Sequence, residues 1–240
     1  MKWYQKAANQ GNPNAQFTLG ERYYYGIGVT EDFSEAVRWY RESAEQGNAD
    51  AQQNLGECYY DGKGVTKDLS EAAKWFKKAA NQGHRNAQLW LGNCFYNGKG
   101  VSIDFSEAVK WYRKSAEQGH VGAQYMLGCC YYLGYGVSID FSEAAKWFRK
   151  SAEQGNADAQ NFLGICYLSG NGVSQDFLEA VKWYTKASEQ GNSGASRNLG
   201  VLYEFHYKVN NHISEAKKWY KKAADQGNED AKKDLERLKN

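Results

Sequence analysis

Apolar residues recur along the chain in two helical patterns that alternate. In one stretch, Ala51, Leu55, Cys58 and Tyr59 follow an i, i+4, i+7, i+8 spacing, which places them on one face of a helix. In the next stretch a second set follows helical spacing: Leu69, Ala72, Trp75, Phe76, Ala79 and Ala80. The pattern therefore predicts two kinds of helix, called helix A and helix B, in alternation.

The pair of patterns repeats every 36 residues through the whole chain. The stretches GVSIDFSEAVKWYRKSAEQG (100–119) and GVSIDFSEAAKWFRKSAEQG (136–155) differ only by two mild apolar exchanges. A single helical hairpin of this size cannot hide its own apolar face, so neighbouring hairpins must stack into a continuous core. One position shows the period most clearly: Trp3, Trp39, Trp75, Trp111, Trp147, Trp183 and Trp219.

Capping residues mark where each helix begins and ends. Asp68 followed by Glu71 three residues later is a capping box at the start of helix B, and Gly83 ends that helix. Asn12 before Pro13 marks the start of a helix A, because proline is favoured at the first helical position. A Gly-x-Gly-Val turn joins A to B in most units.

Residues 51–83 follow the pattern A-x-x-x-L-G-x-x-Y-x-x-G-x-G-V-x-x-D-x-x-E-A-x-x-W-[YF]-x-x-A-A-x-Q-G. This pattern resembles the Sel-1-like repeat family, which is related to tetratricopeptide repeats. The resemblance covers essentially the full chain. It implies an all-α fold, a right-handed superhelical solenoid of antiparallel helix pairs. It also implies a non-enzymatic scaffold or adaptor that binds other proteins.

We expect one solenoid domain over residues 1–240. A partial helix B (1–11) opens the chain, and a C-terminal capping helix (228–240) closes it. The six full repeats are expected at 12–47, 48–83, 84–119, 120–155, 156–191 and 192–227. The first helix B lacks a preceding helix A, so either the chain is trimmed from a longer array or this end meets another molecule, including a second copy.

The sixth repeat departs from the pattern. His206, Tyr207, Lys208 and Val209 stand where Gly-x-Gly-Val is expected, and His212 replaces the capping aspartate. Lysine tolerates a positive φ poorly, so we expect a reshaped last loop.

Composition and charge limit the classes of binding partner and the cellular compartment that we expect for this chain. The 30 basic and 28 acidic residues leave a net charge of +2, which gives no global reason to expect nucleic acid or an anionic membrane. No stretch reaches the roughly 18 apolar residues of a membrane span, and the first residues lack the apolar run of a secretory signal. We therefore expect a cytoplasmic protein, unless a leader lies outside this chain. No cofactor is expected.

The cysteines and histidines do not indicate a metal or catalytic site. Four cysteines hold the same place in successive helices A, about 8–10 Å apart, which is too far for a disulfide. We expect unpaired, buried cysteines and no metal site: Cys58, Cys94, Cys129, Cys130 and Cys166. His84 and His120 stand in for a capping asparagine, and no catalytic residues are identified.

Two other functions remain as alternatives. Some cysteine-rich relatives in the family are associated with β-lactam hydrolysis, but no positioned serine or carboxylate pair supports such an enzyme here. Helix B carries a basic stripe, which includes Lys74, Lys77 and Lys78, that could bind polyanions on the convex face. The helix dipole explains basic residues late in a helix equally well.

Positions on helix A that vary between repeats indicate where a partner binds. They lie beside the packing face, on the stripe that lines the concave surface in tetratricopeptide-like folds. Exposed apolar side chains there would mark an interaction site, or else the neighbouring repeat buries them. The expected groove residues are Leu89, Trp90, Tyr125, Met126, Cys129, Phe162 and Ile165. Alanine at Trp90 and Phe162 is expected to abolish binding and leave stability nearly unchanged if the groove hypothesis holds.

Overall fold

The computed structural model describes residues 2–206 and 210–238 and is entirely helical apart from its turns and loops. Over these residues it contains fourteen α-helices and one π-helical segment, with no β-strand. The chain divides into two compact units, Met1–His120 and Val121–Asn240. The prediction of an all-helical array of 36-residue helix pairs is confirmed.

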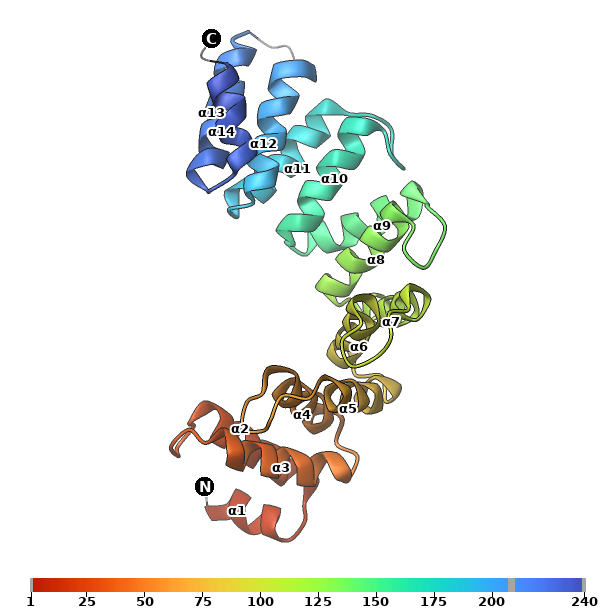
Figure 1. Ribbon diagram of the computed structural model, residues 1–240, viewed down its shortest axis with the longest axis vertical. Helices are drawn as coiled ribbons and strands as arrows, with labels where there is room; N and C mark the ends of the chain where they lie inside the picture. The colour runs from red at the N-terminus through yellow and green to blue at the C-terminus, as the bar shows by residue number, and fades with distance from the viewer. Residues whose placement is uncertain (1, 207–209, 239–240) are drawn as a thin grey trace. The chain divides into compact units, whose positions relative to one another are not determined.

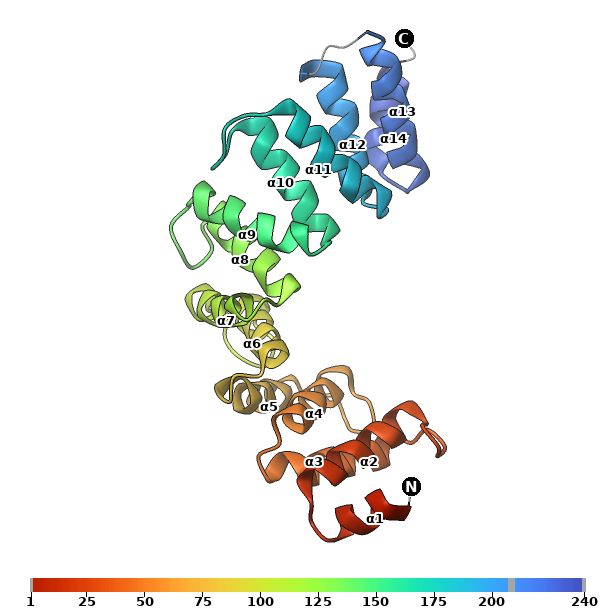
Figure 2. The same ribbon diagram turned by 180° about the vertical axis from the view of Figure 1, so that it is seen from behind.

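The first unit holds three A–B helix pairs preceded by a lone helix B. Within it, successive helices run antiparallel and pack side by side (Figures 1 and 2). Helices A are α2, α4 and α6, and helices B are α1, α3, α5 and α7. Their bounds are α1 Lys2–Asn9, α2 Pro13–Tyr25, α3 Phe33–Glu45, α4 Ala49–Asp61, α5 Leu69–Asn81, α6 Arg85–Asn97 and α7 Phe105–Glu117.

The second unit repeats this plan and closes with a lone helix A, α14. The helix A of the sixth repeat is interrupted, because α12 passes into the π-helical segment η1. The bounds are α8 Val121–Leu133, α9 Phe141–Glu153, α10 Ala157–Ser169, α11 Phe177–Glu189, α12 Ser193–Val201, η1 Leu202–His206, α13 His212–Asp225 and α14 Glu229–Arg237.

The predicted caps form, although the capping box is only half made. The Asp68 side chain accepts hydrogen bonds from the backbone N–H groups of Ser70 and Glu71. The Asp68 N–H, which the Glu71 side chain would satisfy in a full box, instead donates to the Tyr59 carbonyl at 2.9 Å. The Glu71 carboxylate pairs with Lys74 at 2.5 Å. Glu71 therefore pairs with a lysine one turn later in its own helix and does not complete the capping box.

Each Leu-Gly pair lets an aromatic ring of helix B lie directly on helix A. A Cβ at Gly56 would come within 2.6 Å of the Phe76 ring. The same contact recurs in each full repeat, and Leu55 and Phe76 are fully buried. Glycine is needed here for close approach, because any side chain would displace the ring.

The sixth repeat differs from the others on both sides of the loop that the sequence predicts to be reshaped. Its helix A ends in η1, and Asn211 precedes α13 with a φ of 64° and no side-chain capping bond. His212 is the first residue of α13 and does not act as its cap. Tyr207, Lys208 and Val209 lie outside the described residues.

Candidate functional site

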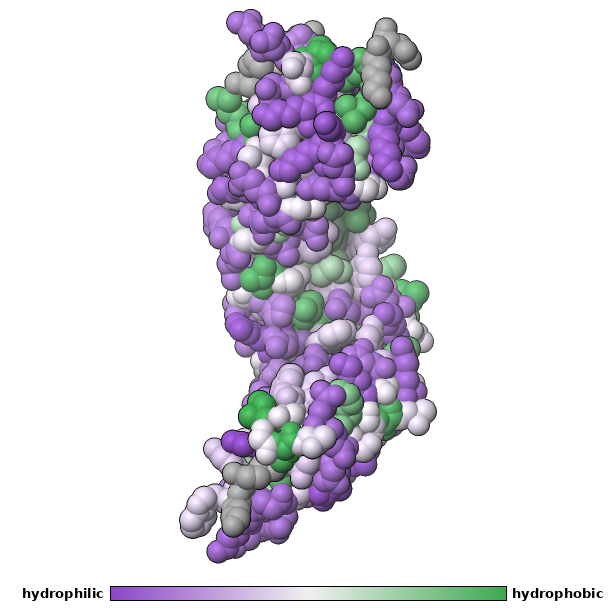
Figure 3. Space-filling view, turned by 90° about the vertical axis from the view of Figure 1, so that its left-hand side faces the viewer, coloured by the Kyte–Doolittle hydropathy of each residue, from purple (hydrophilic) through white to green (hydrophobic). Residues whose placement is uncertain are grey.

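The predicted groove residues lie on three helices A and are all partly buried. Leu89 and Trp90 belong to α6 of the first unit. The others belong to α8 and α10 of the second unit: Tyr125, Met126, Cys129, Phe162 and Ile165. Figure 3 shows one face of the molecule, on which hydrophilic side chains predominate and hydrophobic ones form small separate groups. The seven predicted residues are each partly buried, so they are neither fully exposed nor part of the fully buried core.

Trp90 packs on the core of its own unit. Its ring stacks on Phe76 with centroids 5.5 Å apart and planes inclined by 9°, and it contacts Tyr60 at 5.0 Å. The side chain also hydrogen-bonds to Glu57 on the preceding helix A. Trp90 thus has a structural role in addition to any contact with a partner.

Phe162 makes the equivalent contact in the second unit. Its ring stacks on Phe148 at 5.1 Å, and Tyr125 and Tyr132 each lie 5.9 Å from it. Cys129 packs beside this group and hydrogen-bonds to Tyr125. Together these side chains form a half-buried aromatic surface across α8 and α10.

The type of residue at the repeat position of Trp90 and Phe162 depends on the helix B ring on which it packs. Where helix B presents a phenylalanine, as at Phe76 and Phe148, the next helix A supplies a ring. Where helix B presents Tyr40, the next helix A supplies Asn54, which hydrogen-bonds to the phenol. The variation that the sequence showed at this position is therefore partly a packing relationship.

A ladder of glutamines, which the sequence analysis did not single out, joins the helices. Gln88 is buried, donates to the Ala80 carbonyl at 3.2 Å, and accepts from the Gln118 side chain at 2.8 Å. The same Gln–Gln bond recurs between residues 30 positions apart in five repeats, as Gln46–Gln16, Gln82–Gln52, Gln118–Gln88, Gln154–Gln124 and Gln190–Gln160. The sequence signal for this ladder is the glutamine that recurs at both positions in successive repeats.

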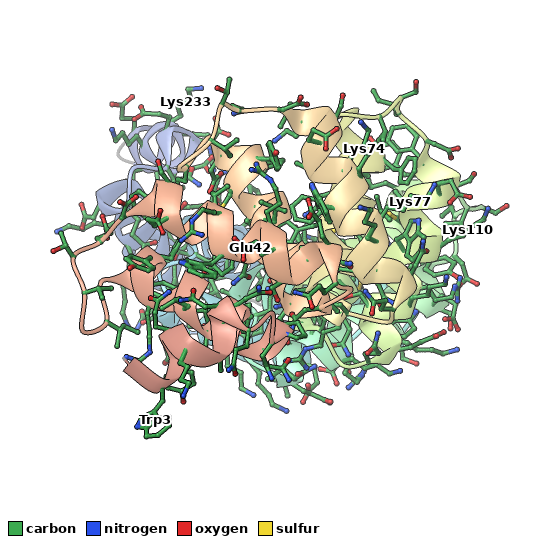
Figure 4. The ribbon with its side chains drawn as sticks, turned by 90° about the horizontal axis from the view of Figure 1, so that it is seen from below. Trp3, Glu42, Lys74, Lys77, Lys110 and Lys233 are labelled. Atoms are coloured by element: carbon green, nitrogen blue, oxygen red, sulfur yellow. The ribbon has the colours of Figure 1, made fainter. Side chains whose placement is uncertain are left out.

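The basic stripe of helix B is largely occupied by contacts within its own helix. Lys74 pairs with Glu71, and the Lys78 ammonium lies 3.7 Å from the centroid of the Trp75 ring. Equivalent cation–π contacts recur at Trp111, Trp147 and Trp183. Figure 4 shows the side chains of Lys74, Lys77 and Lys110 pointing outward. These contacts stabilise the helices and account for the lysines without a polyanion.

All five cysteines are free, and four of them are buried. Burial raises the pKa of every thiol, to about 12 for Cys58, Cys130 and Cys166 and to about 11 for Cys94 and Cys129. These thiols stay protonated at neutral pH, so none is an activated nucleophile. Among the described residues, no group of three or more histidine, cysteine or acidic side chains is arranged to hold a metal ion.

His84 caps α6, as its position in the repeat predicted. Its Nδ1 accepts from the Ala87 N–H at 3.2 Å, while its Nε2 lies 3.1 Å from an Asp50 carboxylate oxygen. Burial and the charge of Arg85 lower the pKa of His120. Within 2–206 and 210–238, no helix is both long and apolar enough to cross a bilayer.

The N-terminal helix leaves apolar surface open. Trp3 is 83% exposed and projects away from the helices (Figure 4), whereas Trp39 and Trp75 at the same repeat position are 3% and 8% exposed. A cavity of about 420 Å³ lies beside it, lined by Trp3, Tyr4, Ala7, Asn12, Asn14, Ala15 and Thr18. Self-association through this end remains a prediction.

Comparison with known families and structures gives a consistent result. The family model for the Sel1 repeat matches residues 1–12, 13–48, 49–84, 85–120, 121–156, 157–192 and 194–228. These boundaries lie within about one or two residues of those expected from the pattern. Among curated proteins, none matches the chain.

Two solved structures resemble the chain over most of its length. The crystal structure of c5321, a protective antigen present in uropathogenic Escherichia coli strains and displaying an SLR fold, is 40% identical with a TM-score of 0.92. The match covers 99% of this chain and 51% of that one, so this chain spans about half of its length. A Sel1 repeat protein from Oxalobacter formigenes is 36% identical, with a TM-score of 0.81 and coverage of 88% and 86%.

Proposed function

Because the chain belongs to the Sel1 repeat family, whose members are typically non-enzymatic scaffolds for protein–protein interaction, we propose that it binds a peptide or protein segment along its helix A stripe. The bound segment lies in the concave groove that helices A are expected to line. The proposed contact residues are those named from the sequence: Leu89, Trp90, Tyr125, Met126, Cys129, Phe162 and Ile165.

The observation that supports this proposal is a contrast along the stripe. The core positions beside it repeat almost unchanged, whereas stripe residues alternate between polar ones, such as Asn54 and Glu57, and apolar ones, such as Phe162 and Ile165. All four side chains remain partly exposed. A surface that varies while its scaffold does not can recognise a particular sequence, and aromatic side chains on it are suitable anchors.

The experiment places a negative charge on the stripe of each unit. Leu89 and Met126 lie on the stripe and are partly buried, so glutamate there should repel an apolar ligand. Peptides are selected from a random 12-residue display library on the wild-type protein and then titrated against the Leu89→Glu and Met126→Glu variants. Lys77→Glu, on the exposed side of α5, is the matched control.

We expect the selected peptides to lose at least tenfold in affinity on one or both stripe variants and to bind Lys77→Glu as they bind wild type. Thermal melts by circular dichroism check that each variant is folded. Equal affinity for all three variants would place binding elsewhere and contradict the proposal. Affinity that falls steeply with salt and is lost in Lys77→Glu would instead support the polyanion alternative.

A further inference from the structure

The stripe contains a small polar niche in the first unit, between α2, α3 and α4. A cavity of about 20 Å³ is lined by Tyr24, Tyr25, Tyr40, Asn54 and Glu57. Tyr24 lies 4.9 Å from Tyr25 and 6.2 Å from Tyr40 between ring centroids, so aromatic rings form much of the wall. A volume of this size admits about one water-sized group.

Comparison with the other repeats explains why the niche is open. The place of Asn54 is taken in the next repeat by Trp90, which stacks on Phe76, and two repeats after that by Phe162, which stacks on Phe148. Asn54 is too small to cover Tyr40 in this way and hydrogen-bonds to its phenol instead. Space that a ring fills elsewhere in the chain is therefore left free here and is surrounded by polar atoms.

The atoms around the niche favour a cation. Glu57 contributes a partly buried carboxylate, which hydrogen-bonds to the Trp90 and Gln53 side chains. Burial raises the pKa of Glu57, while the hydrogen bond from Trp90 and the charge of Lys63 lower it. Lys63 itself is exposed and donates to the Tyr24 hydroxyl at 3.1 Å. Asn54 adds an amide oxygen, and the tyrosines add phenol oxygens and negative ring faces.

We propose that this niche binds the ε-ammonium group of a lysine side chain in the polypeptide that occupies the helix A stripe. The inference rests on the proposed function and adds the chemistry of one ligand residue. An ammonium is compact and carries three N–H donors, so it can bond to Glu57, Asn54 and a phenol oxygen together. A planar guanidinium is too large for a water-sized space, which makes the site selective for lysine over arginine.

The test uses small amides as probes and the full chain as the receptor. Nα-acetyl-lysine N-methylamide is titrated while the indole N–H signal of Trp90, which neighbours Glu57, is followed by NMR. The comparison probes are the arginine and Nε-acetyl-lysine amides and glycine N-methylamide, which offers only an α-ammonium. The variants are Glu57→Gln, which removes the charge, and Asn54→Trp, which fills the niche as Trp90 fills the equivalent space in the next repeat.

Glu21→Gln is the matched control, because Glu21 is a second partly buried carboxylate of the stripe that does not line the cavity. We expect saturable binding of the lysine amide, at least tenfold weaker in Glu57→Gln and Asn54→Trp and unchanged in Glu21→Gln. The arginine and acetyl-lysine amides should bind at least fivefold more weakly than the lysine amide.

Equal shifts with acetyl-lysine, equal losses in Glu21→Gln, or binding that survives in Glu57→Gln would overturn the lysine site. Glycine N-methylamide binding as tightly as the lysine amide would also overturn it and point to a chain terminus. The proposed function is tested separately, since selected peptides that bind Leu89 and Met126 but lack a lysine contact would leave the groove proposal intact and reject only this inference.

Discussion

The ring of Phe162 stacks on the ring of Phe148, with centroids 5.1 Å apart and planes inclined by 23°. Phe162 was expected from the sequence to be a binding residue whose removal leaves stability unchanged. The stack predicts that removal of the Phe162 ring destabilises the folded state. Phe162→Ala should cost about 2 kcal/mol of unfolding free energy, less than a fully buried phenylalanine because the side chain is only partly buried. Urea denaturation measures this loss, and Phe162→Leu should recover much of it.

The control for that prediction is Met126→Ala, at the same repeat position but without an aromatic ring, so that no ring stack is lost. Its cost should be well below that of Phe162→Ala. Equal costs for the two variants would contradict the structural role of the stack.

The glutamine ladder predicts a measurable effect from one buried amide. Gln88→Ala removes two hydrogen bonds, one to the Ala80 carbonyl and one from the Gln118 side chain. Both groups keep another partner, in the Gly83 N–H and the Gly83 carbonyl, so the cost is about 0.5–1.5 kcal/mol for each lost bond. Thermal and urea melts test this. Gln10→Ala, at the repeat position of Gln118 but in the exposed turn that follows α1, should change stability by less than about 0.5 kcal/mol. A wild-type-like melt for Gln88→Ala would contradict the role of the ladder.

The Leu-Gly pair predicts that even a methyl group is poorly tolerated. In Gly92→Ala the new Cβ would lie 2.6 Å from the Tyr112 ring, so the two helices must separate, at a cost of about 1–3 kcal/mol. Gly83→Ala is the comparison: its φ of 90° adds strain of about 1–2 kcal/mol, but no atom lies within 4 Å. A Gly92→Ala and Tyr112→Leu double-mutant cycle should show coupling between these two positions and none between Tyr112 and Gly83.

Buried tyrosines of helix B differ in their hydrogen bonds. The Tyr112 hydroxyl donates to Asn93 at 2.8 Å, whereas the Tyr184 hydroxyl is buried without a partner. Tyr184→Phe should therefore be neutral or stabilising, because it removes an unpaired polar group. Tyr112→Phe should lose about 1 kcal/mol. Equilibrium denaturation compares the two, and a larger loss for Tyr184→Phe would show that its hydroxyl has a partner in solution.

A buried carboxylate ties the reshaped sixth repeat to the last helix. Glu204 in η1 is 8% exposed, accepts from Tyr220 at 2.8 Å, and pairs with Arg237 of α14 at 2.6 and 2.8 Å. Its hydrogen bond to Arg237 lowers the pKa of Glu204, with Tyr220 contributing in the same direction. A carboxylate with a lowered pKa stabilises the folded state above its unfolded pKa, and this stabilisation is lost as the pH falls through the folded pKa.

The melting temperature of Glu204→Gln should therefore lie below that of wild type at pH 7. The difference should shrink as the pH falls below about 4, which is close to the ordinary glutamate pKa. Glu215→Gln removes a partly exposed carboxylate paired with Lys218 at 3.6 Å and should have little effect at any pH. A difference for Glu204→Gln that stays constant from pH 7 to pH 3 would show that the pair is not responsible.

Local signals were sufficient for the helices and the family. Asp68, Gly62 and Gly83 mark helix ends through hydrogen bonds and backbone angles within a few residues, so the sequence shows them directly. The candidate site was harder to predict. Glu57 and Trp90 look like unrelated variable residues, because their contact joins two helices A more than 30 positions apart.

The sequence by itself determined the repeat length, the alternation of two helices and the caps, because each depends on spacing that recurs in every copy. The tertiary structure alone decided which variable residues support the fold and which leave space. Asn54 and Trp90 hold the same place in the repeat, yet one leaves a niche and the other covers a ring. The difference depends on whether Tyr40 or Phe76 lies beneath, and only packing between helices brings those side chains together.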